Sequence, residues 1–392
     1  MNILIYRYGS ICEPDIIEGL QELGHTVTQL TEEIENKNFL PGDCARYVSQ
    51  FLLNHPQDCV FTINFFPIIS EVCNIFKIPY LCWTVDCPVL ELFSKSIQNQ
   101  CNRVFVFDYK QYQEIAQYNP DNIYYFPLAV NINQKQTVIK QASFNQRKHF
   151  SSDISFIGSL YSEKCPYDKL KNPPAYLSGF LNGLIEAQLR VYGYYFIDEV
   201  LTDSVINDFR KHFPNFYVQP FETFLTDKIT LSQLYIGNKI TAVERERTMK
   251  VLSEHFDMDI YTGSDTSRLP KIHNRGFAKT MTEMPIIFHE SRINLNTTSK
   301  AIRSGLPLRI FDIMGCGGFV LTNYQSELPE LFHIGEELVA YSNLDELCDL
   351  TEYYLSHEKD RIEIAHNGFE KVKKDYNYPT RLELLLSLAF SN

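Results

Sequence analysis

One stretch of the chain, residues 303–324, combines residue types that can hold a phosphate group. It reads "RSGLPLRIFDIMGCGGFVLTNY" and contains Arg309, Asp312, Gly315, Gly317 and Gly318. Pro307 is tolerated in a first helical turn because its missing N–H would have no partner there. Gly315 can end the helix, since glycine takes left-handed backbone angles at little cost. A helix start offers free N–H groups, and Arg309 adds a positive charge. The stretch therefore predicts a helix over 307–314 that binds a phosphate-bearing ligand, with the glycines allowing close approach.

Two further motifs have the polar residues expected beside such a ligand. The stretch "DISFIGSLYSEK" predicts a strand followed by a turn at Gly158 and Ser159 and by Lys164. A second predicted strand, "SRINLN", ends at Asn296. The glycines of the first stretch, Gly315, Gly317 and Gly318, could instead form a tight turn without a ligand. Arg292 and the asparagines of "SRINLN" are more typical of structural polar residues that line a cleft.

Two carboxylates are candidates for proton transfer, which requires an acid or a histidine within reach of the reacting hydroxyl. Glu13 follows the first predicted strand in "YGSICEPD", and Asp86 follows the strand "PYLCWTV". Glu13 could instead be an acid at a helix N-terminus, where the helix dipole favours negative charge. Asp86 could be a turn residue before Pro88.

The elements that must position these residues alternate between strand and helix. Apolar runs such as "NILIY", "DCVFTINFF" and "RVFVFD" are separated by segments with helical spacing, as in "EPDIIEGLQELGH". This rhythm is typical of doubly wound α/β domains, whose ligands bind at the carboxyl ends of the strands. The first loop has no G-x-G-x-x-G motif, which argues against a nicotinamide or flavin dinucleotide.

At 392 residues the chain is longer than one core usually serves, so two domains are expected. The predicted boundaries are a first domain at 1–130, a polar linker at 131–152 and a second domain at 153–375. Residues 166–230 are expected to be a helical elaboration of the second domain. The last predicted segment, 376–392, is an apolar helix able to pack on the first domain.

Composition excludes several classes of function. The formal net charge of −12 argues against nucleic acid or an anionic membrane as the main partner. No run of about 18 uncharged apolar residues could span a bilayer. The ten cysteines are scattered without a C-x-x-C pair, and the ten histidines show no metal-ligand spacing. We expect a cytoplasmic protein with reduced thiols and no metal site.

The chain resembles the CgeB-like (spore maturation protein type) glycosyltransferases, a bacterial group with the GT-B fold. The resemblance rests on "DISFIGSLY", "SRINLN", "GLPLRIFDIMGCGGFVLTN", "IAHNGFEKV", "YGSICEPD" and "WTVDCP". It covers most of the chain except about 132–150 and 166–230. The family implies two Rossmann-like domains that face each other across a cleft. It also implies a nucleotide-sugar donor on the second domain, an acceptor on the first, and a C-terminal helix that crosses back to the first domain.

The resemblance also implies roles for single residues. Arg309 is expected to contact the donor diphosphate, together with the loop of Gly158, Ser159 and Lys164. Asp312 resembles the acid that binds the donor ribose in wider GT-B enzymes. The acid expected eight residues earlier is replaced by Ser304, which leaves the inverting or retaining outcome open. Several inverting relatives place their base where Glu13 stands.

The predicted function is metal-independent transfer of a sugar from a nucleotide-diphosphate donor, with UDP the expected nucleotide, to a hydroxyl of a glycan or protein. This is a hexosyltransferase type of activity, and it requires no cofactor. One alternative is a binding or assembly protein that keeps the fold but has lost turnover. A weaker alternative is a nucleotide-sugar epimerase.

Overall fold

The structure is a computed structural model that describes residues 1–36, 38–163 and 165–391. The chain forms two compact units. Unit 1 comprises Met1–Asn131, Gln219–Leu225 and the chain from Asp375 onward, and unit 2 comprises Ile132–Val218 and Thr226–Lys374. No helix in the described ranges is both long enough and apolar enough to cross a membrane.

Unit 1 is built on a parallel sheet with the strand order β2-β1-β3-β4-β5-β6. The strands are β1 (Asn2–Tyr6), β2 (Thr26–Leu30), β3 (Cys59–Ile63), β4 (Tyr80–Trp83), β5 (Asn102–Val106) and β6 (Ile123–Tyr125). All residues of β3 and β4 are buried, as expected for a parallel sheet covered on both faces. The helices are α1 (Glu13–Glu22), α2 (Glu32–Glu35), α3 (Pro41–Asn54), α4 (Pro67–Phe76), α5 (Tyr109–Ala116) and α18 (Tyr378–Phe390), with 3₁₀ turns η1 (Leu90–Phe93) and η2 (Lys95–Gln98).

Unit 2 repeats this plan with the strand order β12-β11-β10-β7-β8-β9, again all parallel. The strands are β7 (Ser152–Ile157), β8 (Met258–Tyr261), β9 (His273–Asn274), β10 (Ser291–Asn296), β11 (Val320–Asn323) and β12 (Val339–Tyr341). Helices on the sheet include α12 (Gly237–His255), α13 (Met284–Glu290), α14 (Leu308–Gly315), α15 (Leu328–Leu331), α16 (Leu344–Ser356) and α17 (Glu358–Asp375). The described strands thus form two Rossmann-like sheets of six strands, which confirms the predicted fold class.

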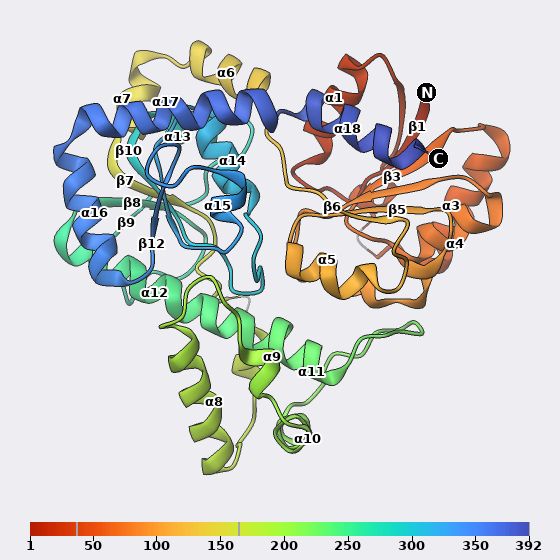
Figure 1. Cartoon of the computed structure of the whole chain (residues 1–392), viewed down its shortest axis with the longest axis horizontal. Helices are drawn as coiled ribbons and strands as arrows, with labels where there is room; N and C mark the ends of the chain where they lie inside the picture. Colours follow the sequence, from red (N-terminus) through yellow and green to blue (C-terminus); the bar gives the residue numbers. More distant parts are fainter. Residues whose placement is uncertain (37, 164, 392) are drawn as a thin grey trace. The chain divides into compact units, whose positions relative to one another are not determined.

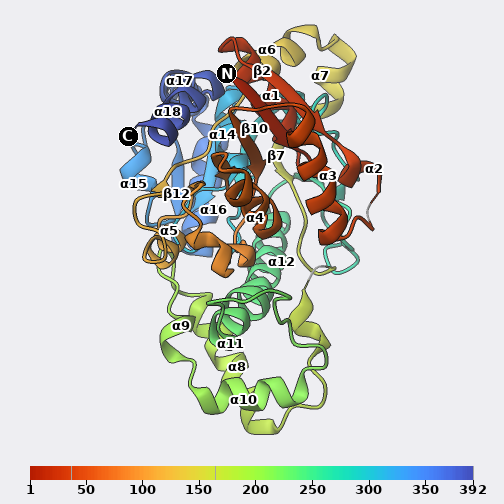
Figure 2. The same ribbon diagram turned by 90° about the vertical axis from the view of Figure 1, so that its right-hand side faces the viewer.

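The helical elaboration of unit 2 has a hydrophobic cluster of its own. It contains η3 (Pro166–Lys169), α8 (Ala175–Gln188), α9 (Ile197–Val200), α10 (Asp203–His212), α11 (Asp227–Ile229) and the π-helix η4 (Thr230–Ile236). Phe209 is fully buried there, with its ring 5.2 Å from that of Phe213 and 5.7 Å from that of Tyr235. Both ribbon views show α8–α11 gathered together below α12 (Figure 1, Figure 2).

The polar segment expected as a linker at 131–152 folds instead as two helices of unit 2, α6 (Ile132–Gln141) and α7 (Phe144–Phe150). On α6 the buried positions are Lys135 and Ile139, which are one helical turn apart. Because Lys135 occupies a buried position where an apolar residue would be expected, the sequence lacks the apolar periodicity that indicates a helix. Ser143 and Gln146 begin α7 with a capping box.

A short strap from the elaboration, Gln219–Leu225, belongs to unit 1. Its backbone pairs with residues 93–95, where Phe224 N donates to Phe93 O at 2.7 Å and Lys95 N donates to Glu222 O at 2.9 Å. The Phe224 ring stacks on Tyr118 at 4.1 Å. The domain boundaries predicted from the sequence did not assign Gln219–Leu225 to the first domain. These seven residues have no apolar periodicity that would indicate where they pack.

The C-terminal helix α18 packs against α1 within unit 1 (Figure 1). A Cβ placed on Gly19 of α1 would lie 2.7 Å from Leu382 Cδ1, so the glycine lets the two helices approach closely. Tyr378 packs its ring 5.9 Å from Trp83, and Arg103 Nε donates to Ala389 O at 2.9 Å.

The packing of α18 predicts that Leu382→Ala destabilises unit 1. Leu382 is fully buried, so its truncation should lower the free energy of unfolding by about 2–5 kcal/mol. Leu384→Ala on the exposed face of the same helix is the matched control, and its effect should stay within about 0.5 kcal/mol. Urea denaturation measures both; equal effects would contradict the packing described here.

Candidate functional site

The candidate site lies at the carboxyl edge of the unit 2 sheet, where β7 and β10 are neighbours. From β7 the chain continues to β8 and β9 on one side, whereas β10 leads to β11 and β12 on the other. Such a reversal of strand order opens a crevice in which α/β proteins bind their ligands. The segments that leave this point are the loop from Gly158 after β7 and the loop from Thr297 after β10, which leads into α14.

Arg309 lies in the first turn of α14 and is held at this crevice. Its Nη1 donates to Asn296 Oδ1 at 3.0 Å, and its guanidinium lies 5.3 Å from the centre of the Phe156 ring. Gly158 has φ +149, and a Cβ there would lie 2.5 Å from Arg309 Nη2. Only glycine leaves room for the guanidinium. The structure thus brings together Gly158, Asn296 and Arg309, which the sequence singled out.

Arg245 on α12 is a second buried arginine at the crevice. It donates to Ser159 O and to Thr297 O, each at 2.6 Å, and so ties the two loops together. Its guanidinium lies 5.6 Å from the centre of the Phe156 ring. Arg245 is not evident as a site residue from the sequence, because it stands in the charged run "ERER", which is typical of a solvated helix face.

Both arginines are buried, and burial makes the charged form of each guanidinium costly. Burial, and then the charge of Arg245, lower the pKa of Arg309 to about 9, and burial lowers the pKa of Arg245. Their side-chain hydrogen bonds go to amide and carbonyl oxygens, which carry no full charge. Arg245 Nε is buried and has no hydrogen-bond partner within the described chain. An anion placed between the two guanidiniums would relieve this cost.

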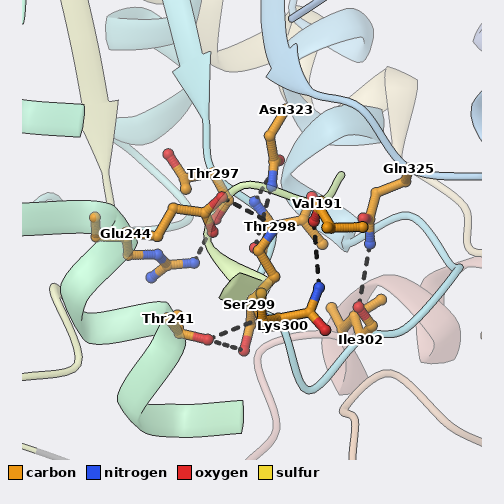
Figure 3. Close-up of polar contacts among 12 residues, drawn as sticks. Val191, Thr241, Glu244, Thr297, Thr298, Ser299, Lys300, Ile302, Asn323 and Gln325 are labelled. Atoms are coloured by element: carbon orange, nitrogen blue, oxygen red, sulfur yellow. Dashed lines mark hydrogen bonds and ion pairs between the residues drawn. The ribbon is translucent and has the colours of Figure 1, made fainter. Parts of the chain in front are cut away.

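The loop that connects β10 to α14 is fixed by its own hydrogen bonds. Figure 3 shows Thr298, Ser299 and Lys300 between Thr241 on α12 and Asn323 at the end of β11. Asn323 Oδ1 accepts from Thr298 N at 2.8 Å, and Thr241 Oγ1 accepts from Lys300 N at 2.9 Å. Lys300 Nζ also lies 3.0 Å from a carboxylate oxygen of the buried Glu244. The first residues of this loop are therefore held in place by α12 and β11.

Asp312, the predicted ribose ligand, lies one turn further along α14. Its Oδ1 is 3.3 Å from Nζ of Lys135 on α6, and both side chains are buried. Burial raises the pKa of Asp312, and the charge of Lys135 opposes that change. Asp312 therefore has an ion-pair partner inside unit 2, and a ribose could use only an oxygen that this pair leaves available. Its ribose role stays a prediction.

The glycines of "GCGG" lie at the opposite end of α14, where the chain turns into β11 at the amino edge of the sheet. Gly317 takes the left-handed conformation, with φ +72, that had been expected at Gly315. A Cβ on Gly318 would lie 2.5 Å from Phe288 O, so this glycine admits the backbone of α13. The prediction that Gly315, Gly317 and Gly318 line the site of Arg309 does not fit this geometry. They were placed at the site because a helix start and a glycine run occur in one motif, although α14 separates them.

The remaining predicted donor residues lie in the loop after β7. Ser159 contributes its carbonyl to Arg245, and its Oγ donates to Glu163 at 2.7 Å. The same Oγ accepts from Tyr161 N at 2.8 Å, so the side chain shapes the loop. Lys164 lies outside the described residues.

Glu13, one of the two predicted bases, is engaged in holding a loop of unit 1. Its Oε1 accepts from the backbone N–H groups of Tyr8, Gly9 and Ser10 at 2.9–3.1 Å. Its Oε2 accepts from Arg7 Nε at 3.0 Å, and its side chain has no exposed surface. A carboxylate with these partners is suited to fixing the loop after β1 and poorly suited to taking a proton from a bound hydroxyl.

Asp86 is exposed at the carboxyl edge of the unit 1 sheet. Its Oδ2 accepts from Asn64 Nδ2 at 2.7 Å, and the same amide nitrogen donates to Tyr8 OH at 3.0 Å. Asn64 has φ +56 and follows β3, which neighbours β1 at the point where the strand order of unit 1 reverses. Asp86 is thus an oriented carboxylate at the ligand-binding edge of its sheet.

The described residues contain no group of three or more His, Cys, Asp or Glu side chains that could hold a metal ion.

Comparison with known proteins identifies the architecture. A model of the family described as Glycosyl transferase-like matches residues 242–387, from α12 to α18. A glycosyltransferase from Rickettsia africae is similar over 100% of this chain and 99% of its own, with TM-score 0.58 and 12% identity. HepE of Anabaena in complex with UDP and glucose is similar over 99% of this chain and 98% of its own, with TM-score 0.55 and 12% identity.

A third similar structure is the sucrose-phosphate synthase of Thermosynechococcus elongatus, which covers 98% of this chain and 97% of its own, with TM-score 0.55 and 10% identity. The search of curated proteins finds no match. The chain therefore has the GT-B fold, with two Rossmann-like domains, and its second half is similar to a glycosyltransferase family. The narrower resemblance to the CgeB-like group stays a prediction.

The contacts of the two carboxylates predict unequal effects of their substitution on stability. In Glu13→Gln the amide group would face Arg7, so one donor would meet another, and the free energy of unfolding should fall by about 2–4 kcal/mol. Asp86→Asn keeps an oxygen for Asn64 at an exposed position, and its effect should stay within about 0.5 kcal/mol. Urea denaturation of both variants checks this, and a stable Glu13→Gln protein would contradict the loop-holding role.

Proposed function

We propose that this protein is a glycosyltransferase that moves a sugar from a nucleotide-diphosphate donor, with UDP as the nucleotide, to a hydroxyl of a glycan or protein acceptor. The observation that carries the proposal is the convergence of Arg245 and Arg309 on the Phe156 ring at the strand-order reversal of unit 2. Glycosyltransferase structures of the same fold, including HepE bound to UDP-glucose, support the choice of donor class.

The role of the two arginines follows from the chemistry of the leaving group. As the bond to the sugar breaks, negative charge grows on the nucleotide diphosphate. Guanidinium groups offer several N–H donors and a charge that stays in place, so their contacts with the diphosphate strengthen in the transition state. Arg245 and Arg309 would supply the charge that a metal ion supplies in other transferases. We therefore propose a metal-independent reaction of the hexosyltransferase type.

We propose that Asp86, rather than Glu13, takes the proton from the acceptor hydroxyl. Asp86 is exposed and is oriented by Asn64, so one carboxylate oxygen is held while the other can face a hydroxyl. Glu13 is buried, and its hydrogen bonds to three backbone N–H groups and Arg7 use both of its oxygens. In this proposal Glu13 fixes the loop after β1, on which Tyr8 and the Asn64–Asp86 contact depend.

A binding protein that has lost turnover is the second candidate. It is favoured by Ser304, which is buried at the position where the wider fold has an acid. Donor hydrolysis or sugar transfer by purified protein would exclude it, and product analysis without acceptor would detect an epimerase.

The arginine pair predicts that UDP stabilises the protein through Arg309. At a UDP concentration of about 100 Kd, the melting temperature should rise by roughly 5–10 °C. In Arg309→Ala the shift should vanish, because a diphosphate contact is lost. Arg46→Ala, at an exposed arginine of unit 1, should keep the full shift. Differential scanning fluorimetry measures all three proteins; an unchanged shift in Arg309→Ala would contradict the assignment.

If Asp86 is the base, its substitution should slow sugar transfer without affecting the binding of UDP. Asp86→Asn should lower the rate of transfer by about 10²- to 10⁴-fold, because the amide cannot accept the proton. The melting-temperature shift with UDP should stay unchanged, since the donor site lies in unit 2. Asp43→Asn, at a half-exposed acid on α3, serves as control. Released UDP reports the rate, and wild-type turnover in Asp86→Asn would rule Asp86 out as the base.

A further inference from the structure

Phe277 is the most exposed large apolar side chain among the described residues, with 84% of its surface accessible. It follows β9 at the carboxyl edge of the unit 2 sheet. Single exposed apolar residues are common on protein surfaces, so exposure alone indicates no site. The surroundings of Phe277 supply the further evidence, because the chain fixes this ring at a defined place.

The tip of the Phe277 ring rests on a residue that has no side chain. A Cβ on Gly263, in the loop after β8, would lie 2.1 Å from Phe277 Cζ and 2.7 Å from Cε1 and Cε2. Contact with the backbone through the ring tip, together with the high exposure, leaves ring faces open to solvent. An exposed aromatic face is a surface on which another planar group can stack.

The turn that carries Phe277 is well defined. Arg275 N donates to Ile260 O at 2.8 Å, which continues the pairing of β9 with β8. Gly276 has φ +76, and its N–H donates to Asn274 Oδ1 at 2.9 Å. The chain therefore turns sharply after β9, and this turn places the Phe277 ring against Gly263.

Phe277 lies on the same edge of the sheet as the arginine pair. Gly158 N donates to Tyr261 O at 3.1 Å, and Leu160 N donates to Ser264 Oγ at 2.8 Å, so the loops after β7 and β8 are joined. Adjacent strands lie about 4.8 Å apart, and β9 is two strands from β7. The Phe277 ring lies at Gly263, in the loop next to the one that contacts the arginines, so one ligand could reach both the arginine pair and the ring.

We propose that Phe277 is the platform on which the nucleobase of the donor stacks, and that Gly263 positions its ring. The inference rests on the proposed function, because it assigns the base of the same nucleotide. Stacking uses the π face that every nucleobase has, so Phe277 should strengthen the binding of nucleotides without choosing among bases.

The test compares UDP with inorganic pyrophosphate, which has the charges of the diphosphate and no base. Calorimetric titration of the full chain should show that Phe277→Ala weakens UDP binding by about 5- to 150-fold. Its affinity for pyrophosphate should match that of the wild type, which also shows that the variant is folded. Phe277→Trp should retain UDP binding. Phe144→Ala removes another exposed phenylalanine, on α7, and should change neither affinity.

Gly263→Ala gives an independent readout, because the added methyl group must displace the ring tip. It should weaken UDP binding and leave pyrophosphate binding unchanged. Equal affinity of wild type and Phe277→Ala for UDP would overturn the inference while the nucleotide site stands. A wild-type protein that binds neither UDP nor pyrophosphate would instead contradict the proposed function, and with it this inference.

Discussion

The placement of two guanidinium groups against one phenylalanine ring is the interaction on which the candidate site depends. Arg245 and Arg309 come from different helices, and both lie over Phe156 at the end of β7. Burial, and then the charge of Arg245, lower the pKa of Arg309, so its charged form is costly in the free protein. Functional sites commonly hold such costly arrangements, because the ligand that relieves the cost is bound more tightly.

The fold provides the means to hold this arrangement. At the strand-order reversal, Gly158 leaves room for one guanidinium, and carbonyl groups of two loops accept from the other. Unit 1 uses the same plan at its own reversal, where Asn64 orients Asp86. In the proposed reaction, unit 2 would supply positive charge for the leaving nucleotide, and unit 1 would supply an oriented carboxylate for the acceptor.

The sequence predicted the parts of this site that stand in motifs with local structural meaning. Gly158, Asn296 and Arg309 follow strands or begin a helix, and the alternation of elements predicted both sheets. Arg245 could not be found in this way, because its burial depends on loops distant in the sequence. Helix α6 could not be predicted for a related reason. The burial of Lys135 is explained only by its ion pair with Asp312, which is distant in the sequence. The glycines of "GCGG" were wrongly predicted to lie beside Arg309. They are close to Arg309 in sequence, but the length of α14 separates them from it in space.

Calorimetric titration of the full chain with UDP, UMP and uridine in the presence of EDTA measures whether the arginine pair binds the diphosphate of a nucleotide. We expect saturable binding of UDP without metal, at least about tenfold tighter than UMP, with uridine weaker still, because each lost phosphate removes charge-assisted hydrogen bonds. Equal affinity for the three ligands, or binding of UDP only when a divalent metal ion is added, would contradict a diphosphate site at the arginine pair.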